Sequence, residues 1–233
     1  MKILITGAAG QLGQEWIEFC KSNKIESIGY SSSELDITNF DQLKAIVDDV
    51  RPTIIANCAA FTKVDEAEDQ AEKAELINAK AVKYLADISA EYGIKLIHYS
   101  TDYVFKGEEK DKLSFPTGYP EDHEINPINE YGRTKWLGEK ALIESHCSFL
   151  LIRVSWLCGK YGNNFVKTMQ KLGVQKEELS VVNDQFGSPT FTDEVVSITH
   201  KLIKKGEEGI FHVSSSGIIN WFTFARQIFL LSD

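Results

Sequence analysis

The sequence predicts an α/β fold, in which a parallel sheet carries helices on both faces. Short apolar runs alternate along the chain with longer helical patterns, and this order is typical of parallel strands joined by right-handed crossovers. The first apolar run, Lys2–Thr6, breaks into glycines at Gly7, Gly10 and Gly13, and a helical pattern follows directly. A strand, a glycine turn and a helix in this order open a Rossmann-type dinucleotide-binding sheet.

The glycine turn also indicates what the sheet binds. Glycines let the backbone turn tightly and approach a pyrophosphate, and the next helix offers free N–H groups at its N-terminus. The spacing here is GxxGxxG rather than GxGxxG, so a glycine-rich turn that binds nothing stays open as the alternative at this point.

Length and composition agree with this class. The 233 residues, 43% hydrophobic and 25% charged, suffice for one large domain or a core with a smaller lobe. A net charge of −9 argues against nucleic-acid and membrane partners, because such surfaces need basic patches. The four cysteines show no CxxC spacing, and neither a signal peptide nor an apolar run of membrane-spanning length is found. We therefore expect a cytoplasmic protein with reduced thiols.

The first half of the chain alternates strand and helix regularly. β-Branched apolar runs mark the strands, and Asn39 or Thr38 can cap the helix that Arg51 and Pro52 close. Gly93 is a stop signal for the longest helical pattern. The expected strands cover 2–6, 25–30, 53–60 and 94–101, and the expected helices cover 14–20, 39–50, 65–75 and 74–92.

The second half begins with a glycine- and proline-rich connection over 106–130, and a loop this long in a compact domain is usually functional. After it we expect strands over 149–156, 179–183 and 209–213 and a turn over 184–190. The expected helices cover 131–143 and 164–172, the stretch from the end of that turn to about 204, and 221–231. These elements divide the chain into a dinucleotide-binding core, 1–155 and 175–203, and a small C-terminal lobe, 156–174 and 204–233.

Tyr131 and Lys135 are the first candidates for chemistry. They stand four residues apart in a helical pattern, so their side chains share one face. A tyrosine with a pKa of about 10 is a poor acid–base catalyst at neutral pH, and a neighbouring ammonium group would lower that pKa. A simple surface pair on a helix is the alternative interpretation.

Several further stretches form a recognisable series with the opening turn. The most specific are Tyr99-Ser-Thr-Asp-Tyr-Val-Phe105 and Asp184-Gln-Phe-Gly-Ser-Pro-Thr190, and the others lie at 35–38, 51–52, 59–68, 127–135, 153–156 and 163–165. On these residues the whole chain resembles the extended short-chain dehydrogenase/reductases, and within them the dTDP-4-dehydrorhamnose reductase (RmlD-like) family. The resemblance implies a Rossmann core and a substrate-binding lobe, which is incomplete here because family members continue beyond the position of Asp233.

The resemblance implies a catalytic set of Thr101, Tyr131 and Lys135. Tyr131 would give a proton to the C4 oxygen of the substrate while hydride arrives from the nicotinamide. Lys135 would bond the nicotinamide ribose and lower the pKa of Tyr131, and Thr101 would bond the substrate carbonyl. The reaction implied is reduction of dTDP-4-dehydro-6-deoxy-L-mannose to dTDP-L-rhamnose, a step of cell-surface polysaccharide synthesis.

The resemblance also implies binding residues. Those for the cofactor are Gly7, Gly10, Gln11, Leu12, Gly13, Asp36, Ile37, Ala59, Ala60, Phe61, Thr62 and Tyr99, together with Tyr131 and Lys135. Those for the sugar nucleotide are Thr101, Asp102, Trp156 and Asn164. Some have structural alternatives: Asp102 as a brace for its loop, Trp156 as a core residue, and Asn78 as a support for backbone.

The cofactor is expected to be NADPH, with NADH as an alternative. No carboxylate occurs in Tyr30–Ser33 at the end of the second strand, where an acidic residue would favour NADH, and Glu34 is the first. We expect no metal site. The histidines lack ligand spacing, and although Glu15, Asp193 and Glu194 lie near positions that bind Mg²⁺ in some relatives, the expected C-terminal ligand is missing.

Two other functions stay open. Within the fold, the chain could reduce another nucleotide-4-keto sugar. From a different class comes a non-catalytic NADP-binding subunit that resembles the β subunit of methionine adenosyltransferase. The expected partner is a nucleotide-sugar substrate, and a homodimer is an open alternative to a monomer.

Overall fold

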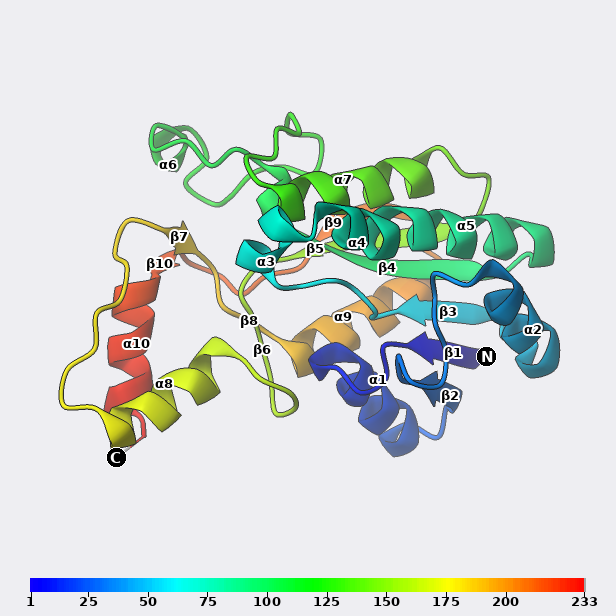
Figure 1. The fold of residues 1–233 in the computed structure, drawn as a ribbon, viewed down its shortest axis with the longest axis horizontal. Helices are drawn as coiled ribbons and strands as arrows, with labels where there is room; N and C mark the ends of the chain where they lie inside the picture. Colours follow the sequence, from blue (N-terminus) through cyan, green and yellow to red (C-terminus); the bar gives the residue numbers. More distant parts are fainter. Residues whose placement is uncertain (233) are drawn as a thin grey trace.

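The computed structural model describes residues 1–232 and confirms the α/β class (Figure 1). Six parallel strands form the main sheet in the order β2-β1-β3-β4-β5-β9. Their bounds are Glu26–Tyr30 for β2, Lys2–Thr6 for β1, Ile54–Asn57 for β3, Lys95–Thr101 for β4, Phe149–Val154 for β5 and Gly209–His212 for β9. The strand order reverses between β1 and β3, which is the switch point where such sheets bind ligands.

Helices cover both faces of this sheet because each central strand is apolar on both sides. In β1, Leu4 faces one hydrophobic cluster, while Ile3 and Ile5 face the other. Helices α2 (Phe40–Val50), α5 (Ala81–Tyr92) and α7 (Glu130–Ile143) pack on the Leu4 side, and α1 (Gln11–Ser22) and α9 (Thr192–Lys205) pack on the opposite side. None of the helices in residues 1–232 is long and apolar enough to span a membrane.

Local signals explain where these helices start and stop. The Asn39 side chain accepts a hydrogen bond from Gln42 N, as the capping pattern predicts. Gly93 ends α5 in the left-handed conformation, with φ 65°, which a residue without Cβ adopts at little cost. Both signals are confirmed.

The segment between β3 and α5 differs from the prediction. β3 ends at Asn57, three residues earlier than predicted. The predicted acidic helix divides into α3 (Val64–Asp69) and α4 (Ala71–Glu75), and a π-helical turn, η1 (Leu76–Lys80), separates α4 from α5. The wide turn contains the buried Asn78, whose contacts belong to the site described below.

A smaller lobe lies beside the sheet. It contains α8 (Phe165–Gln175), α10 (Trp221–Leu230) and the short ribbons β7 (Phe186–Gly187) with β10 (Ile219–Asn220) and β6 (Leu157–Cys158) with β8 (Thr190–Phe191). Figure 1 shows α8 and α10 together at the end of the molecule away from β2. Their aromatic faces meet in a separate core around Phe165 and Phe224.

The lobe corrects two predictions. Residues 179–183, which the structure describes, form no strand; Val181 packs on the lobe core instead. The predicted domain limits also shift, because Gly209–His212 pairs with β5 in the main sheet, whereas Phe186–Gly187 pairs with β10 in the lobe. The second change comes from pairing between strands distant in sequence, which local patterns do not encode.

The long connection over 106–129 holds one short helix, α6 (Asp111–Ser114), and follows a 3-10 turn, η2 (Asp102–Val104). Arg153 on β5 anchors it. Its guanidinium group donates to the Glu121 carbonyl at 2.9 Å and pairs with the Glu139 carboxylate of α7 at 2.7 Å. The Arg153 and Glu139 side chains are 3% and 0% exposed, so this ion pair is fully desolvated.

Removing one partner of this pair should therefore be costly. We expect Arg153→Met to lower the free energy of unfolding by about 3–5 kcal/mol, because the Glu139 carboxylate would stay buried without its partner. Urea denaturation followed by circular dichroism measures the loss. The control is Lys83→Met, which breaks the exposed Lys83–Asp87 pair and should leave stability within error. Equal effects of the two substitutions would contradict this account.

Candidate active site

The glycine turn holds its neighbours at distances that exclude a side chain. A Cβ on Gly7, which has φ 64°, would lie 2.7 Å from the backbone N of Ala59, and a Cβ on Gly13 would lie 2.3 Å from the carbonyl oxygen of Gly7. Gly10 caps α1 without a side-chain hydrogen bond. The turn is thus a close-packed cradle of bare backbone at a helix N-terminus, which suits a pyrophosphate.

Gln11 and Leu12 follow the turn but point in different directions. Leu12 is buried in the core between α1 and the sheet, so it offers a ligand only its backbone. The Gln11 side chain accepts a hydrogen bond from Asn164 Nδ2 at 3.0 Å. Asn164 also donates to the Gly159 carbonyl and caps α8 by accepting from Lys167 N. Gln11 and Asn164 therefore tie the turn to the lobe.

The residues predicted beside the adenine lie in the turn after β2. The Asp36 carboxylate accepts hydrogen bonds from Thr38 N and Thr38 Oγ1, at 2.9 and 2.7 Å, so it braces its own loop. Ile37 is buried in the cluster on the α2 side. Glu34 accepts from both N and Oγ of Ser31, at 2.8 and 2.6 Å, and these hydrogen bonds hold its pKa below the usual range.

Asn78 supports the loop after β3. Its side chain accepts from Phe61 N at 2.8 Å and donates to the Phe61 carbonyl at 3.0 Å and to Thr134 Oγ1 at 3.1 Å. Asn78 thus supports backbone, as the sequence predicts. The loop it holds contains the half-buried Ala59 and Ala60, the buried Phe61 and the exposed Thr62. Phe61 packs in the same small cluster as Tyr131, so the loop and α7 meet there.

Thr101 and Asp102 lie where β4 ends. Thr101 Oγ1 donates to Asp102 Oδ1 at 3.0 Å and accepts from Tyr103 N at 3.2 Å. Burial raises the pKa of Asp102 to about 6, although its hydrogen bond with Thr101 lowers it. The Tyr103 ring meets the Tyr131 ring edge-on, with centroids 5.5 Å apart. The structure therefore brings Thr101, Asp102 and Tyr131 together.

The pKa of Tyr131 does not follow the prediction. Burial is the largest effect and raises this pKa above its ordinary value; a hydrogen bond with Thr101 lowers it, and the charge of Asp102 raises it further. We predicted that the Lys135 ammonium would lower it, but Lys135 Nζ donates instead to the Tyr99 carbonyl at 2.6 Å. Burial lowers the pKa of Lys135 to about 8, and the nearby Glu139 carboxylate raises it.

Tyr99 contacts Lys135 through its backbone carbonyl, and its ring points away to the other face of the sheet. Its hydroxyl accepts from Trp16 Nε1 at 2.8 Å and donates to Thr199 Oγ1 at 3.2 Å, so the ring is buried under α1 and α9. Burial raises the pKa of this hydroxyl above its ordinary value. Whatever support Tyr99 gives a cofactor therefore comes through β4 itself.

Trp156 lies at the junction of core and lobe. It has a left-handed backbone, with φ 44°, and its ring stacks on Trp221 with centroids 3.5 Å apart. A Cβ on Gly187 would lie 2.5 Å from the Trp156 ring, so the 184–190 turn fits closely against it. Trp156 is half-buried, which places it in the lobe core with part of its surface free.

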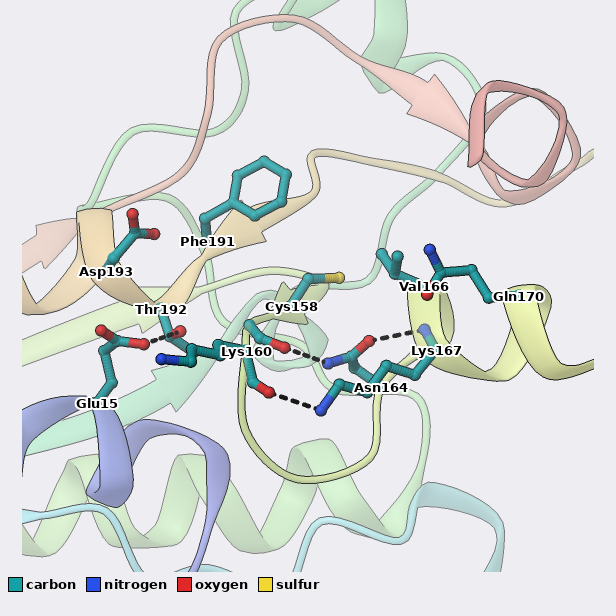
Figure 2. Close-up of a pocket in the computed structure, with 11 residues that line it drawn as sticks. Glu15, Cys158, Lys160, Asn164, Val166, Lys167, Gln170, Phe191, Thr192 and Asp193 are labelled. Carbon is teal, nitrogen blue, oxygen red and sulfur yellow. Dashed lines mark hydrogen bonds between the residues drawn. The ribbon is translucent and has the colours of Figure 1, made fainter. Parts of the chain in front are cut away.

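A cavity of about 440 Å³ opens between α1, α8 and the start of α9. Figure 2 shows Glu15, Asn164 and Asp193 around it, with Glu15 accepting a hydrogen bond from Thr192 Oγ1 at 2.9 Å. Tyr131 and Lys135 do not line this cavity. Within residues 1–232, no three His, Cys, Asp or Glu side chains are grouped closely enough to hold a metal ion.

Sequence reasoning missed two buried polar residues next to Lys135. Asn57 on β3 and His98 on β4 are each 1% exposed, and His98 Nε2 lies 3.4 Å from Lys135 Nζ. The available signal was a polar side chain inside each of two otherwise apolar strands, because such a group must find a buried partner.

Comparison with known proteins places this geometry in context. The model of the family "RmlD substrate binding domain" matches residues 1–233. The dTDP-4-dehydrorhamnose reductase of Aggregatibacter actinomycetemcomitans is 38% identical over 98% of this chain and 78% of its own length. A dTDP-4-keto-6-deoxy-D-glucose reductase of Streptomyces niveus is 37% identical over 98% of this chain and 77% of its own.

A solved structure agrees with these relatives. The crystal structure of dTDP-4-dehydrorhamnose reductase from Bacillus anthracis in complex with NADP superposes with a TM-score of 0.93. Its sequence is 44% identical, and the match covers 99% of this chain and 80% of that one.

The cradle of the glycine turn can be tested directly. We expect Gly13→Ala to weaken NADPH binding by more than about tenfold, because its Cβ would push α1 away from the turn. Gly10→Ala should weaken binding less, since its Cβ would lie 3.2 Å from the Gly7 carbonyl oxygen. Quenching of tryptophan fluorescence by NADPH gives both affinities. An equal loss in the two variants would show that the contact with Gly7 is not what matters.

Proposed function

The chain belongs to the RmlD substrate binding domain family, and on that basis we propose that it is an NADPH-dependent dTDP-4-dehydrorhamnose reductase. It reduces the C4 keto group of dTDP-4-dehydro-6-deoxy-L-mannose and yields dTDP-L-rhamnose. Relatives of that name at 38% identity over nearly the whole chain support this substrate.

One observation carries the proposal. The hydroxyl groups of Thr101 and Tyr131 meet at the carboxyl end of β4, and Lys135 lies one helical turn further along α7. Ligands bind parallel sheets at this edge, and the bare glycine turn lies at the same edge beside the β1–β3 switch point. A proton donor and a dinucleotide cradle are thus held on one rigid sheet.

The residues fit NADPH. Gly7 and Gly13 leave no room for a Cβ, so at these two positions only backbone can face the space that a pyrophosphate would occupy. We assign the pyrophosphate to the N-terminus of α1 at Gly10, Gln11 and Leu12, and the nicotinamide half to Ala60, Phe61 and Thr62. Bound NADPH supplies the hydride that reaches C4.

Tyr131 is the acid. Reduction leaves negative charge on the C4 oxygen, and a donor of raised pKa is fully protonated at neutral pH and ready to neutralise it. Thr101 donates to the same oxygen when its hydroxyl proton turns away from Asp102 Oδ1, its acceptor in this structure. Lys135 bonds the nicotinamide ribose with an N–H that the Tyr99 carbonyl leaves free.

Asp102, Trp156 and Asn164 are our candidates for contact with the sugar nucleotide. Asp102 adjoins Thr101, while Trp156 and Asn164 reach the site from the lobe.

The similarity to a dTDP-4-keto-6-deoxy-D-glucose reductase makes another nucleotide-4-keto sugar the second candidate substrate. Turnover of a panel of such sugars with NADPH separates the two, and turnover of none would favour the non-catalytic alternative. A homodimer remains a prediction, which the molar mass from analytical ultracentrifugation tests.

Loss of the Tyr131 hydroxyl should abolish the reaction. We expect Tyr131→Phe to lower kcat by at least about a thousandfold, because the alkoxide at C4 would have no donor, while NADPH still binds. NADPH oxidation at 340 nm, a wavelength set by the dihydronicotinamide ring itself, measures turnover, and Tyr103→Phe is the matched control on the neighbouring ring. Full activity of Tyr131→Phe would remove Tyr131 from the mechanism.

The cofactor preference follows from the end of β2. Glu34 Oε2 accepts both hydrogen bonds from Ser31, which hold this carboxylate in its own turn, and no other carboxylate occurs in Tyr30–Ser33 to bind a ribose 2′-hydroxyl. We expect NADPH to bind at least as tightly as NADH. Titration of both measures this, and NADH affinity more than about tenfold higher would contradict the assignment.

A further inference from the structure

A row of buried polar side chains crosses the sheet and ends at the catalytic lysine. Thr6 Oγ1 donates to Asn57 Oδ1 at 2.7 Å, and Asn57 Nδ2 lies 3.0 Å from His98 Nδ1. His98 Nε2 in turn lies 3.4 Å from Lys135 Nζ. All four residues are at most 2% exposed, so each must satisfy its polar atoms inside the protein.

The direction of the row is fixed at one end by the backbone. Ala59 N donates to Asn57 Oδ1 at 3.3 Å, and a backbone N–H can only donate. Asn57 Oδ1 therefore faces Ala59 and Thr6, and Nδ2 faces His98. Because an amide NH₂ group also only donates, His98 Nδ1 must be the acceptor.

The protonation of His98 follows. Burial, and then the charge of Lys135, hold the pKa of His98 well below its ordinary value, so the imidazole is neutral. With Nδ1 accepting, its single proton is on Nε2 and points toward Lys135. An ammonium group cannot accept this hydrogen bond, whereas an uncharged amine can.

We propose that His98 is a positioning residue that acts on the reaction through Lys135: its Nε2–H, aimed by Asn57, fixes the position of the Lys135 nitrogen and favours the uncharged amine. The second fixed point of that nitrogen is the Tyr99 carbonyl, 2.6 Å away. Together the two contacts leave one direction of Lys135 Nζ for the nicotinamide ribose. Only this last step rests on the proposed function.

The surroundings of Lys135 bring its ammonium form and its uncharged amine form close in free energy. Burial lowers its pKa to about 8, and the opposing charge is Glu139, one turn along α7 and itself paired with Arg153 of β5. On β4, the neutral His98 faces it. The charge of Asp102 acts on Tyr131, whose pKa it raises. A hydrogen bond that depends on the protonation of Lys135 can therefore shift its titration near neutral pH.

The first test reads the tautomer. In nitrogen NMR of protein labelled at histidine, with the His98 signals assigned by their loss in His98→Gln, we expect Nδ1 unprotonated and Nε2 protonated from about pH 5 to 9. The Nε2 signal should move as Lys135 titrates, and Lys135→Met should abolish that step. A proton on Nδ1, an imidazolium at neutral pH, or no step would overturn the proposal. None of these readouts needs turnover.

The second test measures the effect on the lysine. In His98→Gln the amide oxygen can accept from the Lys135 ammonium and so favours the charged form, and we expect the pH dependence of NADPH affinity that Lys135 sets to move to higher pH by about one unit. His200→Gln is the control, since the His200 ring packs on Phe19 on the opposite face of the sheet from Lys135. Affinity lowered equally at every pH in His98→Gln would show a merely structural role. Absence of NADPH binding by the native chain would refute the proposed function and leave the tautomer test intact.

Discussion

The close approach of α7 to the π-helical turn at Asn78 is the constraint on which the site depends. A Cβ on Gly138 would lie 2.1 Å from the Asn78 carbonyl oxygen, so the helix sits directly on that backbone. The side chain of the same asparagine holds Phe61 on one side and Thr134 on the other. One residue thus sets the distance between the loop after β3 and α7. The π-turn gives Asn78 its place, since the wider ring shifts the register of the side chains that follow it.

β4 transmits this constraint to the reacting end of the sheet. Successive side chains of a strand point to opposite faces, so His98 faces α7 while Tyr99 faces α1 and α9. The Tyr99 hydroxyl is held by Trp16 and Thr199, and its carbonyl holds Lys135. Because β4 is fixed from both layers, Thr101 ends the strand in a defined position. A site built on such a strand keeps its geometry better than one built on loops alone.

The sequence predicted the parts of the fold that local chemistry determines. The cap at Asn39, the stop at Gly93 and the glycine cradle follow from backbone requirements that a few residues satisfy. The strand at Gly209–His212 was predicted, but its place beside β5 was not, and the π-turn was missed altogether. Both depend on partners distant in sequence: β5 for the strand and Phe61 for the turn. At the site, too, sequence reasoning could not predict contacts between residues that lie far apart in the chain.

Spacing put Tyr131 and Lys135 on one helical face, which the structure confirms, but it could not reveal where the Lys135 nitrogen goes. A four-residue spacing suggests that the ammonium acts on the phenol, yet the buried nitrogen finds a nearer acceptor in the Tyr99 carbonyl. Burial then raises the pKa of Tyr131 and lowers that of Lys135, so each group is driven toward its uncharged form. For a reductase this is the useful arrangement: the acid must hold its proton until hydride transfer creates the oxyanion that takes it. The reverse oxidation would begin from the phenolate, the form that burial of Tyr131 disfavours.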